Sequence, residues 1–448
     1  MSKKARGSSS FKSLEKQSEQ VTFRKDERIL IVSSPHPGAT LSAALLSTAI
    51  LRSNRPFHIT FVHPHLDIEE INNIRKTHPN SAVIAVGIDV FGKRRLKKGT
   101  SYPVFIGGML HSEHNELLSI GAASNVAAAA FILAKEKFKI NDRALQLAAA
   151  GTLICNASNM PIKGASRGVV SLAEKGGLLK ERKGFKLFGS NFLPAISALL
   201  YSTFPYLKGI SGVQERCEHI LEEANIPISK RRGPITSLDT KEAQRLTSQL
   251  IPNLDSTTIP GVLGQDFIFP TESEESPLHF LSGIKALSQS AWSRWDLGAS
   301  VAVWMGDRAR TLRSFIDSHM AHTRDVIAGM QNLASSLDKT TSEGSDLDAV
   351  VTIPLVGTHE SVLPDVARIA LQSYLANRDG FVMLTTEACT AVAWDAKKAN
   401  LHQVTKAMNS LGLVSIPTSD SSLKLETTSP SEQRTVADAL CSLGGSRS

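Results

Sequence analysis

The sequence predicts an α/β protein with a larger domain around a mostly parallel sheet and a smaller α/β domain at its C-terminal end. Short apolar runs alternate with longer alanine- and leucine-rich segments over residues 29–153, a pattern typical of buried strands and the helices that cover them. A polar stretch at residues 337–346 interrupts the pattern, and strands and helices resume after it. The 448 residues are enough for two or three domains, each with its own core.

The alternation places the elements of the larger domain, residues 29–336. Its first strand is expected at Arg28–Ser34, an apolar run that closes on small residues before Pro35 breaks it. Further strands are expected at residues 57–62, 82–86, 103–106 and 299–305. Helices are expected at residues 40–51, 68–77, 122–137, 142–153 and 278–290, with a helical extension between 163 and 264 and a long connecting helix at 307–336.

The two ends of the chain have different character. Residues 1–28 are predicted to be a flexible basic tail, because serine and lysine outnumber large apolar side chains there. Residues 337–346 read as a linker, and residues 347–448 as the smaller domain. That domain should contain strands at residues 349–353, 381–385 and 391–394 and helices at 363–375, 401–410 and 431–443.

The composition excludes several classes of protein. The cysteines, Cys155, Cys217, Cys389 and Cys441, are far apart and form no CxxC pair, so neither a disulfide framework nor a zinc ribbon is expected. No apolar run approaches ~20 residues and the first residues are polar, so we expect no membrane helix, no secretory signal and a cytoplasmic location. A net charge of +8, from 50 basic and 42 acidic side chains, permits nucleic-acid binding without requiring it.

One segment carries a family resemblance. Residues 193–212 read LPAISALLYSTFPYLKGISG, and the helix that follows ends in EEANIP. This segment resembles the stretch "ALxYSTDPYxPGLTG" and the next helix of archaeal RecJ-like proteins in the DHH phosphoesterase superfamily. Residues 119–135, 147–153 and 280–307 resemble further segments of that family in the same order. The resemblance implies a DHH-type parallel-sheet domain followed by a DHHA1-type domain.

Active members of this family are metal-dependent exonucleases, in which Asp and His side chains hold two divalent ions, usually manganese. At the first motif, which reads SHxDADGxxSA in active members, this chain has Ser34, His36 and Gly38 at the ligand positions. Gly107 and Gly108 follow the strand after which the Asp-His-His triplet belongs, and Cys155 stands where a fourth carboxylate belongs. The resemblance therefore implies a scaffold that has lost its metal ligands.

The phosphate-binding loop of the DHHA1 domain is also altered. Active members carry GGGHxxAAG, in which backbone amides and a histidine grip phosphate. The matching stretch here, residues 411–421, reads LGLVSIPTSDS. It has one glycine and no histidine, and Pro417 removes an amide.

Two further sets of residues are candidates for ligand binding. A rearranged metal site would draw on His36, His63, Asp89, His111 and His114, although these residues are better interpreted as ordinary loop residues. Basic candidates for contact with nucleic acid or a partner protein are Lys93, Arg94, Arg95, Lys97 and Lys98 in one run and Arg231 and Arg232 in a later turn.

These observations favour a catalytically inactive RecJ-like protein without a metal cofactor. Degenerate RecJ relatives serve in the replicative helicase assembly, so the resemblance implies GINS and the MCM helicase as partners and single-stranded DNA as a ligand. Two alternatives stay open. The first is an active single-strand-specific 5′–3′ exonuclease that uses manganese or magnesium at the rearranged site. The second is a non-catalytic subunit of an RNA-processing complex, paired with an active RecJ-like paralogue.

Overall fold

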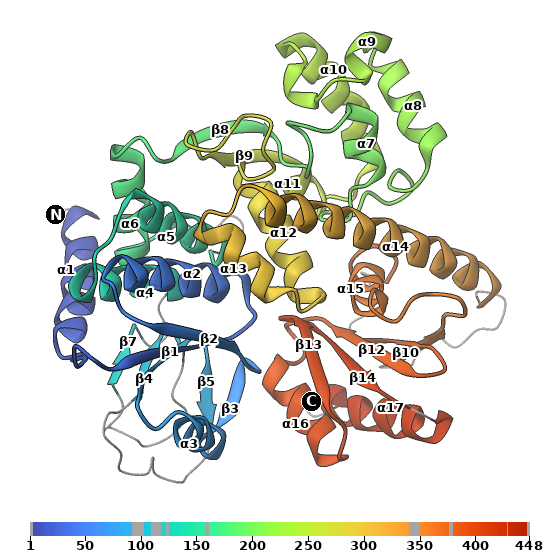
Figure 1. The fold of residues 1–448 in the computed structure, drawn as a ribbon. Coiled ribbons are helices and arrows are strands. Elements are labelled where there is room, and N and C mark those ends of the chain that lie inside the picture. The colour runs from blue at the N-terminus through green and yellow to red at the C-terminus, as the bar shows by residue number, and fades with distance from the viewer. Residues whose placement is uncertain are drawn as a thin grey trace.

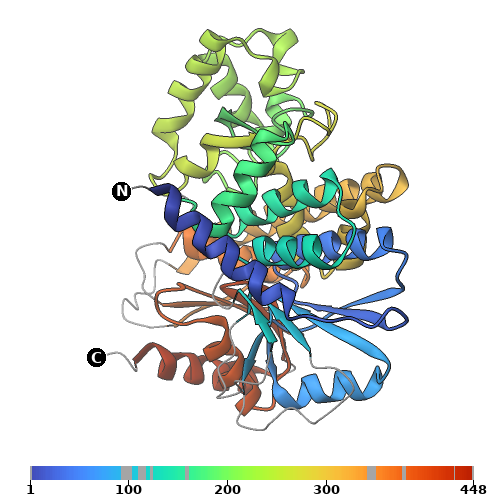
Figure 2. The ribbon, with the colours of Figure 1, turned by 90° about the vertical axis from the view of Figure 1, so that its left-hand side faces the viewer.

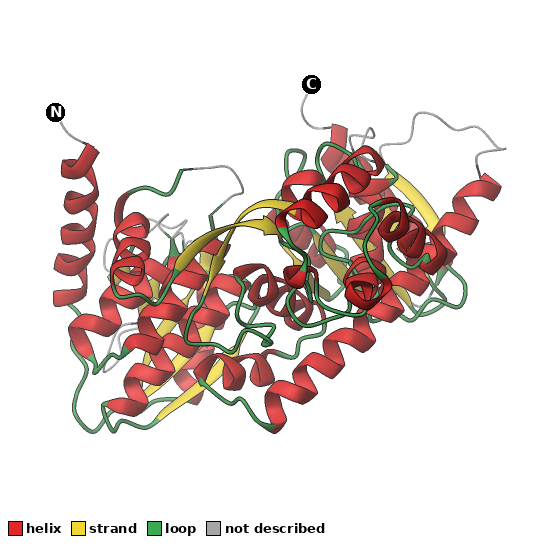
Figure 3. Cartoon of the chain, turned by 90° about the horizontal axis from the view of Figure 1, so that it is seen from above, coloured by secondary structure: helices red, strands yellow, loops and turns green. Residues whose placement is uncertain are grey.

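The computed structural model describes residues 3–91, 103–108, 118–121, 125–156, 161–340, 350–375, 380–427 and 429–445. It has three parts: a first lobe around a parallel sheet, a helical part, and a last lobe around a mixed sheet (Figure 1). Seen from above, the N-terminal helix lies at one end of the molecule, well away from the C-terminus (Figure 3). The predicted α/β class, with a separate C-terminal sheet domain, is confirmed.

The first lobe contains a sheet with the strand order β2-β1-β4-β6-β7, in which all neighbours are parallel. The strands are β1 (Arg28–Ser33), β2 (Phe57–Phe61), β4 (Ser81–Val86), β6 (Val104–Ile106) and β7 (Leu118–Ile120). A separate parallel pair is formed by β3 (His65–Asp67) and β5 (Asp89–Phe91). The strands predicted at residues 57–62, 82–86 and 103–106 are therefore present, within one residue at each end.

Alternate residues of β1 point to opposite faces of the sheet, and each face has its own core. Ile29 and Ile31 pack with the helices α2 and α5, whereas Leu30 and Val32 pack with α3. The helices of the first lobe are α2 (Pro37–Arg52), α3 (Ile68–Thr77), α4 (Val126–Lys137), α5 (Asp142–Ile154) and α6 (Gly164–Lys175). This double covering explains why the strands read as continuous apolar runs.

The N-terminal residues are not the flexible tail that the sequence predicts. They form α1 (Lys3–Glu19), which crosses the outer side of the first lobe and packs against α4 and α6 (Figure 2). Leu14 and Val21 are buried, and Phe11 packs against Gly168 of α6. A few apolar residues at helical spacing are enough when neighbouring helices supply the rest of the core.

Residues 299–305 are also a correction, because they are helical and not extended. They belong to α13 (Leu297–Met305), which packs against α2 and α14. A short apolar run that is buried on most sides has no periodicity that separates a helix from a strand.

The helical part follows the first lobe and has a core of its own. Its helices are α7 (Ala195–Leu200), α8 (Gln214–Glu223), α9 (Ile228–Arg231), α10 (Thr240–Leu250) and α11 (Ile259–Val262), with 3-10 turns η1 (Ile235–Ser237) and η2 (Ile251–Asn253). The antiparallel ribbon of β8 (Lys180–Phe185) and β9 (Leu263–Ile268) brackets this part in the sequence. Two helices, α12 (Leu281–Ser293) and the long α14 (Arg310–Thr340), then lead to the last lobe.

The last lobe has the strand order β10-β11-β12-β14-β13, parallel between β10 and β11 and antiparallel elsewhere. The strands are β10 (Val350–Pro354), β11 (Phe381–Thr385), β12 (Cys389–Trp394), β13 (Ser415–Ser419) and β14 (Ser422–Glu426). One face packs on α15 (Leu363–Ser373), and the other packs on α16 (Leu401–Ser410) and α17 (Pro430–Gly445). The hairpin of β13 and β14 was not predicted.

The predicted linker at residues 337–346 overlaps the last turn of α14, and its residues 341–346 lie outside the described residues. No helix in the described part of the chain is both long enough and apolar enough to span a membrane.

Candidate functional site

The resemblance places the metal ligands of active relatives at the carboxyl ends of the first-lobe strands. At this edge the backbone amide after each of three strands donates a hydrogen bond to the end of the neighbouring strand. Ser34 N–H donates to Val86 O at 3.0 Å, Gly87 N–H to Ile106 O at 2.9 Å and Gly107 N–H to Ile120 O at 3.1 Å. The loops after β1, β4 and β6 are therefore joined to neighbouring strands by backbone hydrogen bonds.

The start of α2 is packed against the end of α5. A Cβ atom added to Gly38, the second residue of α2, would lie 2.0 Å from Cys155 Sγ. Real Cβ atoms do not approach another heavy atom so closely, so the sulfur of Cys155 occupies the space that a side chain at position 38 would need. A side chain at position 38 would therefore fit only if the thiol of Cys155 rotated away.

The two glycines after β6 are equally confined. Gly107 has φ +68°, and a Cβ atom there would lie 2.5 Å from Val126 Cα. A Cβ atom on Gly108 would lie 1.9 Å from Ile88 O. Both obstacles are backbone atoms, which cannot rotate aside as a side chain can. The first two side chains of an Asp-His-His triplet therefore have no room at these two positions.

The rearranged metal site does not form in the described part of the chain. No group of three or more His, Cys, Asp or Glu side chains lies in a metal-binding arrangement there. His36 contacts the last lobe at Asp420, whereas His63 and Asp89 belong to a different cluster described below. His111 and His114 lie outside the described residues. Divalent ions of the family's type need a converging set of oxygen and imidazole ligands, which the described residues do not supply.

His36 is the N-cap residue of α2, and its ring bridges the two lobes. Its Nδ1 accepts a hydrogen bond from Gly38 N–H at 3.0 Å, and its Nε2 lies 3.6 Å from Asp420 Oδ2. Burial alone would lower the pKa of His36, but the hydrogen bond with Cys155 and the carboxylate of Asp420 together raise it to about 9. The ring also meets Trp292 edge-on, with 5.7 Å between centroids.

A second histidine cluster joins β3 and β5 to α16 of the last lobe. His65 Nε2 lies 3.6 Å from Asp89 Oδ2, and the His65 ring lies 5.4 Å from that of His402. His402 stacks on Phe91 with 3.6 Å between ring centroids. Burial, with the nearby His65 and His402, lowers the pKa of His63 to about 4. The lowered pKa keeps His63 neutral at pH 7, where its ring packs between the two lobes.

The hairpin that replaces the phosphate-binding loop is docked on α12. Trp292 Nε1–H donates to Pro417 O at 3.0 Å, and Gln289 Nε2–H donates to Thr418 O at 3.1 Å. The hydroxyls of Thr418, Ser419 and Ser422 hydrogen-bond to one another and are buried. The backbone carbonyls of Pro417 and Thr418 therefore accept hydrogen bonds from side chains of α12.

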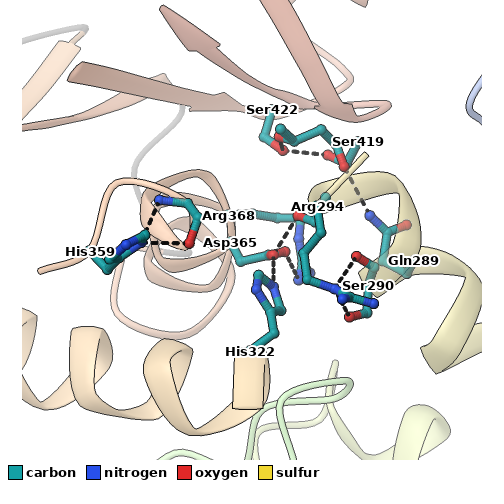
Figure 4. Close-up of polar contacts among 12 residues, drawn as sticks. Gln289, Ser290, Arg294, His322, His359, Asp365, Arg368, Ser419 and Ser422 are labelled. Atoms are coloured by element: carbon teal, nitrogen blue, oxygen red, sulfur yellow. Dashed lines mark hydrogen bonds and ion pairs between the residues drawn. The ribbon is translucent and has the colours of Figure 1, made fainter. Parts of the chain in front are cut away.

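A buried charged cluster lies beside this hairpin, among α12, α14 and α15 (Figure 4). Asp365 accepts hydrogen bonds from His322 Nε2–H at 2.8 Å, from an Arg368 N–H at 3.0 Å and from the Ser293 hydroxyl. Burial would raise the pKa of Asp365, but hydrogen bonds from His322 and Ser293 and the charge of Arg368 hold it well below its usual range. Asp365 is therefore a fully partnered buried carboxylate.

The basic candidates are only partly described. Lys93, Arg94, Arg95, Lys97 and Lys98 lie outside the described residues. Arg231 Nε–H donates to Ile226 O at 2.7 Å, so part of its side chain holds the turn after α8, whereas Arg232 is exposed.

Sequence reasoning missed the residues that join the lobes: Asp420, Asp365, His322 and the indole of Trp292. A signal existed for Asp365, since it is a lone acid on the apolar face of a helix that starts at Leu363. Nothing local marks Asp420, because its partner His36 lies almost the whole chain away.

The fold matches solved structures. CDC45 from Entamoeba histolytica superposes with a TM-score of 0.62 over 98% of this chain and 99% of that one, at 10% sequence identity. The chain therefore has the fold of CDC45. RecJ from Thermus thermophilus, in complex with Mn²⁺, covers 97% of this chain and 55% of its own, with a TM-score of 0.43 and 13% identity. Neither a protein-family model nor a curated protein matches the chain. The predicted two-lobed α/β architecture is thus confirmed.

Proposed function

We propose that this protein is a catalytically inactive RecJ-like factor that acts as a structural component of the DNA replication machinery, with GINS and the MCM helicase as partners. The observation that carries the proposal concerns the edge of the first lobe where the resemblance places the metal ligands. Neighbouring atoms already occupy the space that ligand side chains would need there. Gly38, Gly107 and Gly108 are each blocked by a neighbouring heavy atom at 2.5 Å or less from the missing Cβ position. The CDC45-like fold and the family resemblance supply the replication context.

The arrangement of the lobes supports the same proposal. A phosphodiesterase of this family needs an open passage between its metal ions and its phosphate-binding loop. Here the hairpin at residues 415–426 bonds directly to Trp292 and Gln289, and its tip reaches His36. In the proposed function, the hairpin therefore contacts the other lobe at the place where an active relative would contact its substrate.

A nuclease assay tests the loss of activity. We expect the purified chain, supplied with manganese or magnesium, to leave end-labelled single-stranded DNA and RNA intact. Metal-dependent degradation that His36→Ala abolishes would overturn the proposal and support the exonuclease alternative. His58→Ala, which alters an exposed histidine on β2, is the matched control.

Affinity capture tests the partners. The full chain with a C-terminal tag should recover GINS and MCM subunits from native extract under conditions that retain protein complexes. Recovery of RNA-processing nucleases without GINS would favour the alternative of a non-catalytic subunit paired with an active RecJ-like paralogue.

Single-stranded DNA binding is the remaining part of the proposal. The basic run from Lys93 to Lys98 and Arg232 are the candidate contacts. Binding through phosphate contacts weakens steeply with salt, so alanine at these basic positions should lower both affinity and its salt dependence. An unchanged salt slope would exclude these residues from the contact.

A further inference from the structure

A small pocket lies where α12, α14 and α15 meet the loop after α7, beside the cluster around Asp365 (Figure 4). Its volume is about 20 Å³, which is room for one particle about the size of a water molecule. No residue of the edge where the resemblance places the metal ligands lines this pocket. Its lining includes Phe204, Ser290, His319, Thr323, Asp365 and Arg368.

Three buried side chains of this lining hold a polar atom that has no hydrogen-bond partner within the described residues. The atoms are Arg368 Nε, Thr323 Oγ1 and His319 Nδ1, and the three residues are 9%, 1% and 5% exposed. A buried threonine in a helix often donates to the carbonyl one turn earlier, as Thr48 does to Ala44 O at 2.8 Å, but Thr323 makes no such bond. Because a buried donor without a partner destabilises the fold, a ligand that accepts from these groups would stabilise it.

The groups around the pocket are mainly hydrogen-bond donors. Arg368 Nε–H can only donate, and the Ser290 hydroxyl, which accepts from Arg294 Nε–H at 3.3 Å, keeps its own proton for donation. Burial, with the nearby His322 and Arg294, lowers the pKa of His319 to about 3, so this imidazole is neutral and has one N–H to donate. A water molecule in the pocket would need acceptors for its own protons, whereas an anion only accepts.

The charges near the pocket also favour an anion. The Lys285 ammonium lies 5.3 Å from the centre of the Phe204 ring, and the guanidinium carbon of Arg368 lies 5.6 Å from the same centre. Lys285 forms no ion pair with the described residues. The carboxylate in the lining, Asp365, already accepts hydrogen bonds from three side chains. Lys285 and Arg368 together therefore outweigh the charge of Asp365.

We propose that this pocket binds a single halide ion, in nature chloride. Arg368 Nε–H, the Thr323 hydroxyl and the His319 imidazole with its proton on Nδ1 donate to the ion, and Lys285 adds positive charge at longer range. The small volume excludes an oxyanion such as phosphate, whose oxygen atoms need more room. Because the lining comes from α12, α14 and α15, the bound ion stabilises the packing of the last lobe on the two helices that lead to it.

A halide titration of the full chain tests the proposal. Urea unfolding is followed at increasing sodium chloride, with sodium gluconate keeping the ionic strength constant. Urea is the denaturant because guanidinium salts add an anion of their own. A ligand that binds only the folded chain stabilises it by mass action, so the unfolding midpoint should rise with chloride and with bromide. A midpoint that does not depend on halide would refute the proposal.

Two threonine variants separate a specific site from a general salt effect. Thr323→Val keeps the shape of the side chain and removes a donor, so about tenfold more chloride should be needed for the same rise of the midpoint. In gluconate alone it should be at least as stable as the parent chain, because an unpartnered hydroxyl is gone. Thr48→Val, which removes a hydroxyl bonded to Ala44 O, is the matched control and should keep the parent's chloride dependence. Equal chloride dependence of Thr323→Val and the parent would overturn the site.

Bromide locates the ion directly. A crystal of the full chain grown in sodium bromide should give an anomalous peak among Ser290, Thr323 and Arg368. Density there without an anomalous signal would identify a water molecule and overturn the proposal, as would bromide bound only elsewhere. None of these outcomes depends on the proposed function, because the nuclease assay and the capture of partners measure other parts of the molecule.

Discussion

The last lobe meets the rest of the chain at two carboxylates that differ in almost every physical respect. Asp365 is buried, and three side chains donate hydrogen bonds to it. Asp420 is 75% exposed, and its contact with His36 is 3.6 Å long. Only Asp365 has the burial and the hydrogen-bond partners expected of a contact that holds two lobes together.

The difference indicates how the lobes stay in register without metal ions or substrate. The buried cluster around Asp365 and the hydrogen bond from Trp292 fix α12, α14 and the hairpin relative to one another. The more exposed contact at Asp420 is expected to add little to stability. Four measurements test this division.

Asp365→Asn should have the largest effect. The substitution removes the charge that His322 and Arg368 face and leaves a buried cation without its partner, so the free energy of unfolding should fall by about 3 kcal/mol. Chemical denaturation measures it. Asp317→Asn, on the exposed side of α14, is the control and should change stability by less than about 0.5 kcal/mol. If the two substitutions lowered the free energy of unfolding equally, the contrast between a buried and an exposed carboxylate would be wrong.

Trp292→Phe should come next. It deletes the donor to Pro417 O and part of a buried ring, so a loss of about 2 kcal/mol is expected. Trp304→Phe is the matched control, because Trp304 is equally buried and its Nε1 has no hydrogen-bond partner within the described residues. The difference between the two variants, about 1 kcal/mol, measures the bond to the hairpin. No difference would mean that the hairpin is held by packing alone.

The pH dependence of stability should show a smaller effect from His63. Its pKa is about 4 in the folded chain, against an ordinary value of 6.5, so the unfolded chain binds more protons between these values. Stability should therefore fall as the pH is lowered from 6.5 to 4. His63→Asn should recover about 1 kcal/mol of this loss, and His58→Asn, at an exposed position, should not. The raised pKa of His36 has the opposite sign: its contribution is present below pH 6.5 and is lost as the pH rises through about 9.

Asp420→Asn should have the smallest effect on stability, less than about 0.5 kcal/mol, because the carboxylate is exposed and screened. It is the same chemical change as Asp365→Asn, so the pair of denaturation curves tests the comparison directly. A loss as large as that of Asp365→Asn would show that the lobes depend on the exposed contact.

The sequence was sufficient for most of the fold wherever apolar periodicity was distinct. The helices at residues 68–77 and 401–410 and the strand at 381–385 have the predicted bounds. The sequence was insufficient at α13, because a run that is buried on most sides shows no helical periodicity of apolar residues. It was also insufficient at α1, because its few apolar residues form a core only together with those of α4 and α6. The hairpin from Ser415 was missed because the resemblance assigned residues 411–421 to a phosphate-binding loop, whereas the hydroxyls of Thr418, Ser419 and Ser422 hydrogen-bond to one another inside the lobe.

For the candidate site, the sequence indicated positions along the chain but not the contacts between them. Family resemblance located the altered positions, including His36, Gly38 and Cys155, but could not show that Gly38 and Cys155 touch. Contacts between residues 36 and 420, or 292 and 417, depend on how the lobes are placed, and no local pattern in the sequence carries that information.

The contact between Gly38 and Cys155 also couples two positions that lie more than a hundred residues apart in the chain. An aspartate at position 38 would place its Cβ 2.0 Å from Sγ, so the thiol of Cys155 would have to rotate away or be replaced. Any design that places a carboxylate at this edge must therefore accommodate a change at Cys155 as well as at Gly38.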